Sequence, residues 1–278
     1  MTQIIGFAGK KQSGKNVSCN FVMMMKMKQL GISERIRVNN TTGELEFQDI
    51  LGERLNGWFT LNSVNMESLY NSVGPFCKIY GLADALKDIA INVLGLPRDK
   101  VYGTDEDKMS ETHLRWENMP GVTTEVTPQD PIDKEIAGRL GRYYEKVLSG
   151  IVYHEPGPMT IREVLQYMGT EIFRKMYEHV WVDTLLRRIE EDAPEIALIC
   201  DARFDNELIL LKNRGAIILG LLRDIFQSKD THASEQINFD LCSAVIDNRE
   251  RTIPEQCEAI YNMLVKLKCK HIPQMIIG

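Results

Sequence analysis

The chain has 278 residues, of which 44% are hydrophobic and 26% are charged. These fractions are ordinary for soluble globular proteins, so they exclude a collagenous, low-complexity or wholly disordered chain. The net charge of −6 argues against a nucleic-acid polymer as partner, because such a partner needs a broad basic face. A small phosphorylated ligand is compatible with this charge.

No membrane-spanning segment is expected, because the longest apolar run, 216–222, is far shorter than the roughly 20 residues that a spanning helix needs. The N-terminal sequence MTQIIGFAGKK lacks the basic flank, apolar stretch and cleavage site of a signal peptide. We therefore expect a cytoplasmic protein with no membrane partner. The six cysteines include no C-x-x-C pair, which predicts reduced thiols rather than a zinc site or a disulfide framework.

The first predicted unit is a strand, a loop and a helix. Residues 4–8 (IIGFA) are apolar and β-prone, and apolar residues at helical spacing follow over 17–25. Gly31 is expected to end that helix. A second strand at 76–80 leads into an amphipathic helix over 82–94, with Gly95 and Pro97 just beyond it.

A third helical region is expected to open at Thr160, because the sequence from Thr160 to Glu163 fits a capping box. In a capping box, each of the two side chains satisfies a free backbone donor at the helix start. The region runs in two pieces toward residue 189, and the break between them is expected at the Gly169-Thr170 step.

Three further apolar runs, at 196–200, 216–222 and 244–246, alternate with helical patterns. Continuous apolar strands without hairpin turns predict an α/β fold with a mostly parallel sheet of about five strands, flanked by helices on both faces. Polar segments at about 32–73 and 98–149 interrupt this alternation. We interpret the whole chain as a single domain with two insertions.

The strongest functional motif follows the first predicted strand, where GKKQSGK matches the G-x-x-x-x-G-K phosphate-binding pattern. Glycines let the backbone wrap a phosphate, the following helix presents its N-terminus, and the lysine supplies a mobile charge for the β- and γ-phosphates. The alternative is a surface turn with solvated lysines. The residues expected to bind the cofactor are Gly9, Lys10, Gln12, Ser13, Gly14, Lys15 and Asn16.

Asn16 stands where the pattern has Ser or Thr as a magnesium ligand, and the nearest hydroxyl, Ser18, comes two residues too late. A second acid is found at Asp201, which ends an apolar run at the strand edge where parallel sheets bind ligands. Arg203 follows and is suited to meet a phosphate. The alternative role for Asp201 is to cap the next helix. The predicted catalytic residues are Lys15, Asp201 and Arg203, and Asp201 is also the predicted metal ligand.

Three further cations, Lys87, Arg162 and Arg174, lie on or beside predicted helices. Each alone fits a solvated surface charge. Phosphoryl transfer, however, needs cations around the acceptor phosphate and the group being transferred. We therefore expect these three residues to bind substrate.

Several segments together resemble the bacteriophage deoxynucleoside monophosphate kinases. They are GFAGKKQSGKN at 6–16, ALKD at 85–88, TIREVLQYMGTE at 160–171, ICDARFDNE at 199–207 and DTHASE at 230–235. The resemblance implies a phosphate-loop kinase fold and transfer of a phosphoryl group from ATP to a deoxynucleoside monophosphate, with Mg²⁺. For a phage-encoded enzyme it implies the host cytoplasm.

The same resemblance places Gln166, Thr170 and Glu171 around the acceptor nucleotide, together with Lys87 and Arg162. It also includes a late motif, whose role does not follow from its residues His232, Ser234 and Glu235. Related phage enzymes often have Asp at the position of Asn16, so the missing hydroxyl is interpreted as a feature of this branch.

Two alternatives stay open on the sequence alone. One is another small-molecule kinase of this build, of the phosphomevalonate or dephospho-coenzyme A type, because a phosphate loop does not specify the acceptor. The other is a non-catalytic nucleotide-binding protein. Base preference does not follow from the sequence. The segment 98–149 is expected to be a mobile cover over bound nucleotides. The alternative is an insertion that is disordered or forms a dimer contact, so a homodimer is one possibility.

Overall fold

The computed structural model describes residues 2–31, 36–48, 58–60, 72–124, 143–146, 151–223 and 237–273. The chain divides into two compact units. The first unit comprises Met1–Asp84 and His179–Gly278, and the second comprises Ala85–Glu178. The boundary falls at the start of helix α3 (Asp84–Asn92).

The first unit is built on a five-stranded sheet in the order β13-β12-β1-β11-β5, in which every neighbouring pair is parallel. The predicted parallel α/β sheet is therefore confirmed. Its strands are β1 (Gln3–Ala8), β5 (Cys77–Tyr80), β11 (Ile196–Ala202), β12 (Ile217–Leu222) and β13 (Ala244–Asp247).

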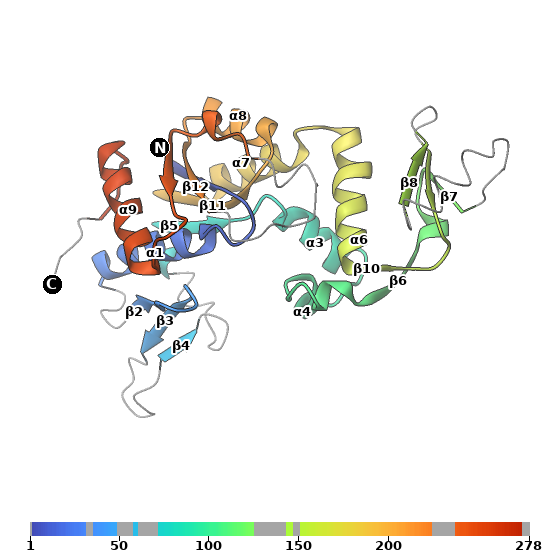
Figure 1. Cartoon of the computed structure of the whole chain (residues 1–278), viewed down its shortest axis with the longest axis horizontal. Coiled ribbons are helices and arrows are strands. Elements are labelled where there is room, and N and C mark those ends of the chain that lie inside the picture. The colour runs from blue at the N-terminus through green and yellow to red at the C-terminus, as the bar shows by residue number, and fades with distance from the viewer. Residues whose placement is uncertain are drawn as a thin grey trace. The chain divides into compact units, whose positions relative to one another are not determined.

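Helices cover both faces of this sheet, which explains why its middle strands are continuously apolar. Helices α1 and α9 pack together on one face, and α7 and α8 pack together on the other (Figure 1). Side chains such as Ile5, Phe7 and Leu198 are fully buried between the layers. The helices are α1 (Lys15–Gln29), α7 (Val180–Asp192), α8 (Asp205–Asn213) and α9 (Ile253–Lys266).

Two smaller features complete the first unit. Strands β2 (Ile36–Val38), β3 (Leu45–Gln48) and β4 (Trp58–Thr60) form an antiparallel sheet within the first predicted insertion. Helix α1 ends as expected, because Gly31 follows its C-cap with a φ of 66°, a conformation that glycine adopts without strain.

The second unit packs around Trp116, whose ring stacks on His154 at 3.9 Å between centroids and meets the edge of Tyr167 at 5.3 Å. Beside this core lie two small sheets, β10-β6 and β7-β9-β8. The elements are α4 (Arg98–Val101), β6 (Glu111–Arg115), β7 (Val122–Thr123), β8 (Tyr143–Lys146), β9 (Ile151–His154), β10 (Pro158–Thr160), α6 (Ile161–Gln166) and the π-helical segment η3 (Tyr167–Arg174).

The third helical region begins as predicted but breaks elsewhere. The capping box is present, since Thr160 Oγ1 accepts from Glu163 N and Glu163 Oε2 accepts from Thr160 N. The break expected at Gly169 is wrong, because the chain stays helical there as η3 and α7 starts only at Val180. Gly169 instead permits close packing, since an added Cβ would lie 2.8 Å from Leu86 Cδ2.

All six cysteines are free, as predicted. Burial raises the pKa of Cys77 and Cys257 to about 12. These thiols therefore stay protonated at neutral pH. In the part of the chain that the structure describes, no helix is both long enough and apolar enough to cross a membrane.

An ion pair between a buried lysine of α1 and a partly exposed glutamate ties this helix to the residue before β11. Lys26 Nζ lies 2.6 Å from Glu195 Oε2, and the lysine side chain is only 5% exposed. We expect Glu195→Ala to lower the free energy of unfolding by about 1–3 kcal/mol, because it leaves a buried ammonium without its carboxylate. Urea denaturation measures this difference.

The matched control is Glu190→Ala, which breaks an exposed pair with Arg214 and should change the free energy of unfolding by less than about 0.5 kcal/mol.

The hydrogen bond from Lys26 lowers the pKa of Glu195. The pair therefore stabilises the fold above the unfolded pKa of Glu and loses its effect as the pH falls through the lower folded value. Equal losses in both variants would contradict a special role for Glu195.

Candidate active site

The predicted phosphate loop connects β1, the middle strand of the sheet, to α1. Two of its glycines are needed, one because of a close approach and one because of its backbone conformation. A Cβ on Gly9 would collide with Ser13 Oγ and lie 2.9 Å from Leu221 O, and Gly14 has a φ of 98°. Gln12 also has a positive φ, of 61°. The loop is therefore a tight backbone turn at the carboxyl end of the sheet.

Helix α1 starts directly from this turn. Its N-cap is Gly14, which provides no side-chain hydrogen bond, and its first turn contains no acidic residue. The positive end of the helix dipole is thus not compensated by a capping side chain, and its first N–H groups are suited to an anion. This local geometry fits a phosphate group.

Lys15 lies at the centre of the loop. Its ammonium donates to Gly9 O at 2.7 Å and to Lys10 O at 2.6 Å, and the residue is 7% exposed. The loop backbone therefore curls around this charge. Asn16 is exposed on the first turn of α1, whereas Ser13 is fully buried against Gly9.

Asp201 is the second-last residue of β11 and holds a neighbouring turn. Its carboxylate accepts hydrogen bonds from Leu82 N at 2.8 Å and from Ala83 N at 3.4 Å. The alternative that it caps α8 is wrong, because Phe204 occupies the N-cap and Glu207 Oε2 accepts from its backbone N–H. Asp201 therefore fixes the turn between β5 and α3.

Arg203 follows the end of β11, with a half-buried side chain, and its backbone N–H is bound by Glu207. A further cation that the sequence reasoning missed is Arg223, which follows the end of β12. Its Nε is buried and has no hydrogen-bond partner among the described residues. The rule that singled out Asp201, a polar residue at the end of an apolar strand, also applies to Arg223.

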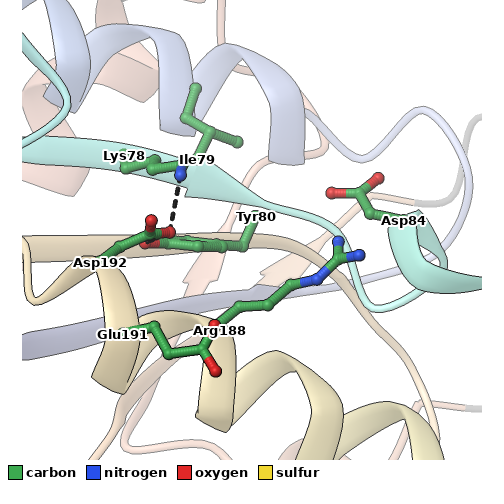
Figure 2. A pocket seen from close by; sticks show the side chains of 7 residues that line it. All are labelled: Lys78, Ile79, Tyr80, Asp84, Arg188, Glu191 and Asp192. Carbon is green, nitrogen blue, oxygen red and sulfur yellow. Dashed lines mark hydrogen bonds and ion pairs between the residues drawn. The ribbon is translucent and has the colours of Figure 1, made fainter. Parts of the chain in front are cut away.

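The first unit contains a hollow of about 280 Å³ beside β5, lined by charged side chains (Figure 2). Its charges are partly balanced internally, since Asp192 Oδ2 accepts from Lys78 Nζ at 2.6 Å and from Tyr80 Oη at 2.8 Å. Burial and the hydrogen bond to Asp192 raise the pKa of Tyr80. Three carboxylates make the hollow a poor place for a phosphate. The lining residues are Lys78, Ile79, Tyr80, Asp84, Arg188, Glu191 and Asp192.

Asp84 joins this hollow to the turn that Asp201 holds. Its Oδ2 accepts from Gly81 N at 2.7 Å, so two carboxylates fix the same short turn, one from the start of α3 and one from β11. Figure 2 shows the Arg188 side chain extending toward Asp84. The turn between β5 and α3 is therefore a well-anchored part of the sheet edge.

All residues expected to bind the acceptor lie in the second unit. Lys87 lies over the ring of Tyr102, with Nζ 4.5 Å from the centroid, and Arg162 Nη2 donates to Asp105 Oδ1 at 2.6 Å. These residues occur on α3, α6 and η3, and α3 meets η3 where Leu86 contacts Gly169.

The remaining acceptor candidates differ in exposure. Gln166 and Thr170 are exposed, Arg174 is half-buried, and Glu171 pairs with Lys175 at 2.7 Å. The first unit thus holds the phosphate loop with Asp201 and Arg203, and the second holds the acceptor candidates. His232, Ser234 and Glu235 lie outside the described residues, as do 125–142 and 147–150 of the predicted cover.

A parallel sheet flanked by helices, with a phosphate-type loop on its middle strand, is the architecture of the phosphate-loop kinases. Residues 106–253, more than half of the chain, match the family model for deoxynucleotide monophosphate kinase. The chain belongs to the deoxynucleotide monophosphate kinase family. The matched region includes Asp201 and the acceptor candidates from Arg162 onward, whereas the assignment of the phosphate loop depends on its own motif and geometry.

The chain is also similar to the deoxynucleoside-5'-monophosphate kinase of Escherichia phage T5, with 35% identity over 82 residues. That alignment covers 27% of this chain and 33% of the phage protein. The similarity thus spans about a third of the length of this relative.

The tight approach at Gly9 yields a prediction about the loop. Gly9→Ala should weaken ATP binding by at least about tenfold, equivalent to about 1.4 kcal/mol, because the new methyl group cannot fit between Ser13 and Leu221 without moving the loop. Isothermal titration calorimetry measures the affinity. Gly6→Ala, on the strand that precedes the loop, is the control, since its Cβ would meet only Ile218 at 3.6 Å. Equal ATP affinity in the two variants would contradict the loop assignment.

Proposed function

We propose that this protein transfers the γ-phosphoryl group of ATP to a deoxynucleoside monophosphate, giving ADP and a deoxynucleoside diphosphate. The observation that carries the proposal is the phosphate-type loop at the head of α1, in a chain of the deoxynucleotide monophosphate kinase family. The acceptor class comes from the family. The donor comes from the loop, whose geometry suits a triphosphate.

In the proposed reaction, an oxygen of the acceptor phosphate attacks the γ-phosphorus and the bond to the β-phosphate oxygen breaks. Such transfers depend on positioning and on neutralisation of spreading negative charge rather than on covalent participation of the protein. Backbone N–H groups of Gly9–Lys15 and the start of α1 would hold the donor phosphates. Lys15 would follow the γ-phosphate, and Arg203 would meet the transferring group.

The acceptor would be held by residues of the second unit. The cations Lys87, Arg162 and Arg174 would contact its phosphate, because guanidinium and ammonium groups match phosphate oxygens in charge and donor number. The exposed Gln166 and Thr170 would supply neutral hydrogen bonds to the nucleoside.

A magnesium ion bound with the nucleotide would neutralise part of the charge of the donor phosphates. The described residues contain no cluster of three or more His, Cys, Asp or Glu side chains that could cage a metal. Ser18 is already committed, since its hydroxyl donates to Gly14 O and accepts from Gln256. The donor set therefore fits a cation held by phosphates and water, with Asp201 as the protein carboxylate that orients that shell.

The assignment of the loop and the acceptor is tested by a coupled assay of ADP release, with ATP and a panel of deoxynucleoside and ribonucleoside monophosphates. We expect turnover with deoxynucleoside monophosphates. Lys15→Ala should reduce the rate by about 10²–10³-fold, since it removes a preorganised charge. Lys28→Ala, which changes an exposed lysine near the end of the same helix, should leave the rate unchanged.

Release of ADP only with a non-nucleotide acceptor would replace the proposal with the sister-kinase alternative. ATP binding without any acceptor-dependent turnover would favour a nucleotide-binding protein. A folded Lys15→Ala protein with the parental rate would remove the role assigned to the loop.

The role proposed for Asp201 in organising magnesium gives a separate prediction. Asp201→Asn keeps an oxygen for the Leu82 N–H but removes the charge, so the variant should need roughly tenfold more Mg²⁺ for its half-maximal rate. Affinity for metal-free ATP should stay within about twofold. Asp205→Asn, at an exposed position four residues on, is the control. An Asp201→Asn enzyme with parental magnesium dependence and rate would show that the carboxylate only holds the turn.

A further inference from the structure

Two buried amide side chains lie behind the phosphate loop. Asn248 follows β13 and is 0% exposed, and Gln256 lies in the first part of α9 and is 1% exposed. Both are more than 230 positions from the loop in the sequence. Buried amides are costly unless their hydrogen bonds are satisfied, so their partners are informative.

Each hydrogen of these two amides has an acceptor. Asn248 Nδ2 donates to Ser13 O at 2.9 Å and to Gln256 Oε1 at 2.7 Å. Gln256 Nε2 donates to Gly14 O at 2.8 Å and to Ser18 Oγ at 3.0 Å. A flip of Asn248 would place its oxygen against two acceptor oxygens, so the hydrogen-bonding pattern fixes its orientation.

These hydrogen bonds hold two successive carbonyl groups of the loop. In a trans peptide the C=O and N–H bonds point in opposite directions. Holding Ser13 O therefore directs the N–H of Gly14 away from Asn248, and holding Gly14 O directs the N–H of Lys15 away from Gln256. These two N–H groups belong to the part of the loop that is suited to a phosphate.

The two amides are themselves fixed. Asn248 N donates to Leu222 O at 2.8 Å, which ties the residue to β12. Gln256 lies just after a capping box formed by Thr252 and Glu255. Gln256 also packs on the Cα of Gly14, since a Cβ added there would lie 2.5 Å from Gln256 Nε2. The loop is therefore supported by a residue that is tied to the sheet and by a residue of a helix.

We propose that Asn248 and Gln256 are positioning residues that preset the direction of the Gly14 and Lys15 N–H groups toward bound phosphate. The inference rests on the proposed function only in that the loop binds the phosphates of the donor. A donor site whose N–H groups are already directed does not spend binding energy on ordering them.

The test uses inorganic tripolyphosphate, which probes the loop without base, acceptor or transfer. Asn248→Asp and Gln256→Glu keep the size of each side chain but replace the donating NH₂ group with an oxygen. That oxygen would face the oxygen atoms that now accept from the amide. At pH 8 we expect each to bind tripolyphosphate at least about tenfold more weakly than the parent by calorimetry. Asn262→Asp changes an exposed residue on the same helix as Gln256. Its affinity for tripolyphosphate should stay within about twofold of that of the parent.

A pH profile separates positioning from a general loss of structure. Burial raises the pKa of a carboxyl group, so the new carboxylate of the Gln256→Glu variant should gain a proton as the pH falls and again donate to the loop. The affinity of Gln256→Glu relative to the parent should then recover toward pH 6, while thermal unfolding shows the variant folded throughout. Gln256→Met has a similar volume and no hydrogen bonds, and should stay weak at every pH. If Gln256→Glu does not fold, the tripolyphosphate affinity of Gln256→Met decides whether Gln256 positions the loop.

Folded variants at both positions with tripolyphosphate affinity within twofold of the parent would overturn the proposal. So would a parent protein that does not bind tripolyphosphate. A parent that binds tripolyphosphate but transfers no phosphoryl group would instead contradict the proposed function, while the comparison of variants would still decide the role of the two amides.

Discussion

The direction of the strands in the central sheet is the constraint on which the first unit depends. All neighbouring strands are parallel, so their carboxyl ends lie at one edge. The loop at Gly9 follows β1, Asp201 lies near the end of β11, Arg223 follows β12 and Asn248 follows β13. If any of these four strands ran in the opposite direction, the polar residue at its carboxyl end would lie at the other end of the sheet.

Residues at this edge are linked to one another across the sheet, and this gives the candidate site its rigidity. Asp201 binds the backbone of Leu82, 119 residues away in the sequence, and Asn248 binds Ser13, 235 residues away. The same side chains that close the fold thus shape the loop that would hold phosphate. The same contacts support both the fold and the proposed site, so isosteric variants with fold controls are needed to separate the two effects.

The sequence predicts those features whose causes are local. Continuous apolar runs identified the five parallel strands, and the spacing from Thr160 to Glu163 identified the capping box. The continuation of the helix through Gly169 was missed. Its close packing against Leu86 involves a residue on another helix, which the local sequence does not show. The hydrogen bonds of Asp201, Asn248 and Gln256 were missed for the same reason. Their backbone partners lie more than 100 residues away in the chain.

The central claim, that the loop binds the donor and that the second unit binds the acceptor, is tested most directly by hydrogen exchange followed by mass spectrometry. The account predicts that ATP alone slows amide exchange in peptides covering 9–18 and leaves 161–174 unchanged. A deoxynucleoside monophosphate alone should slow exchange in 161–174. Slower exchange of 161–174 with ATP alone, or no change of 9–18 on saturation with ATP, would contradict it.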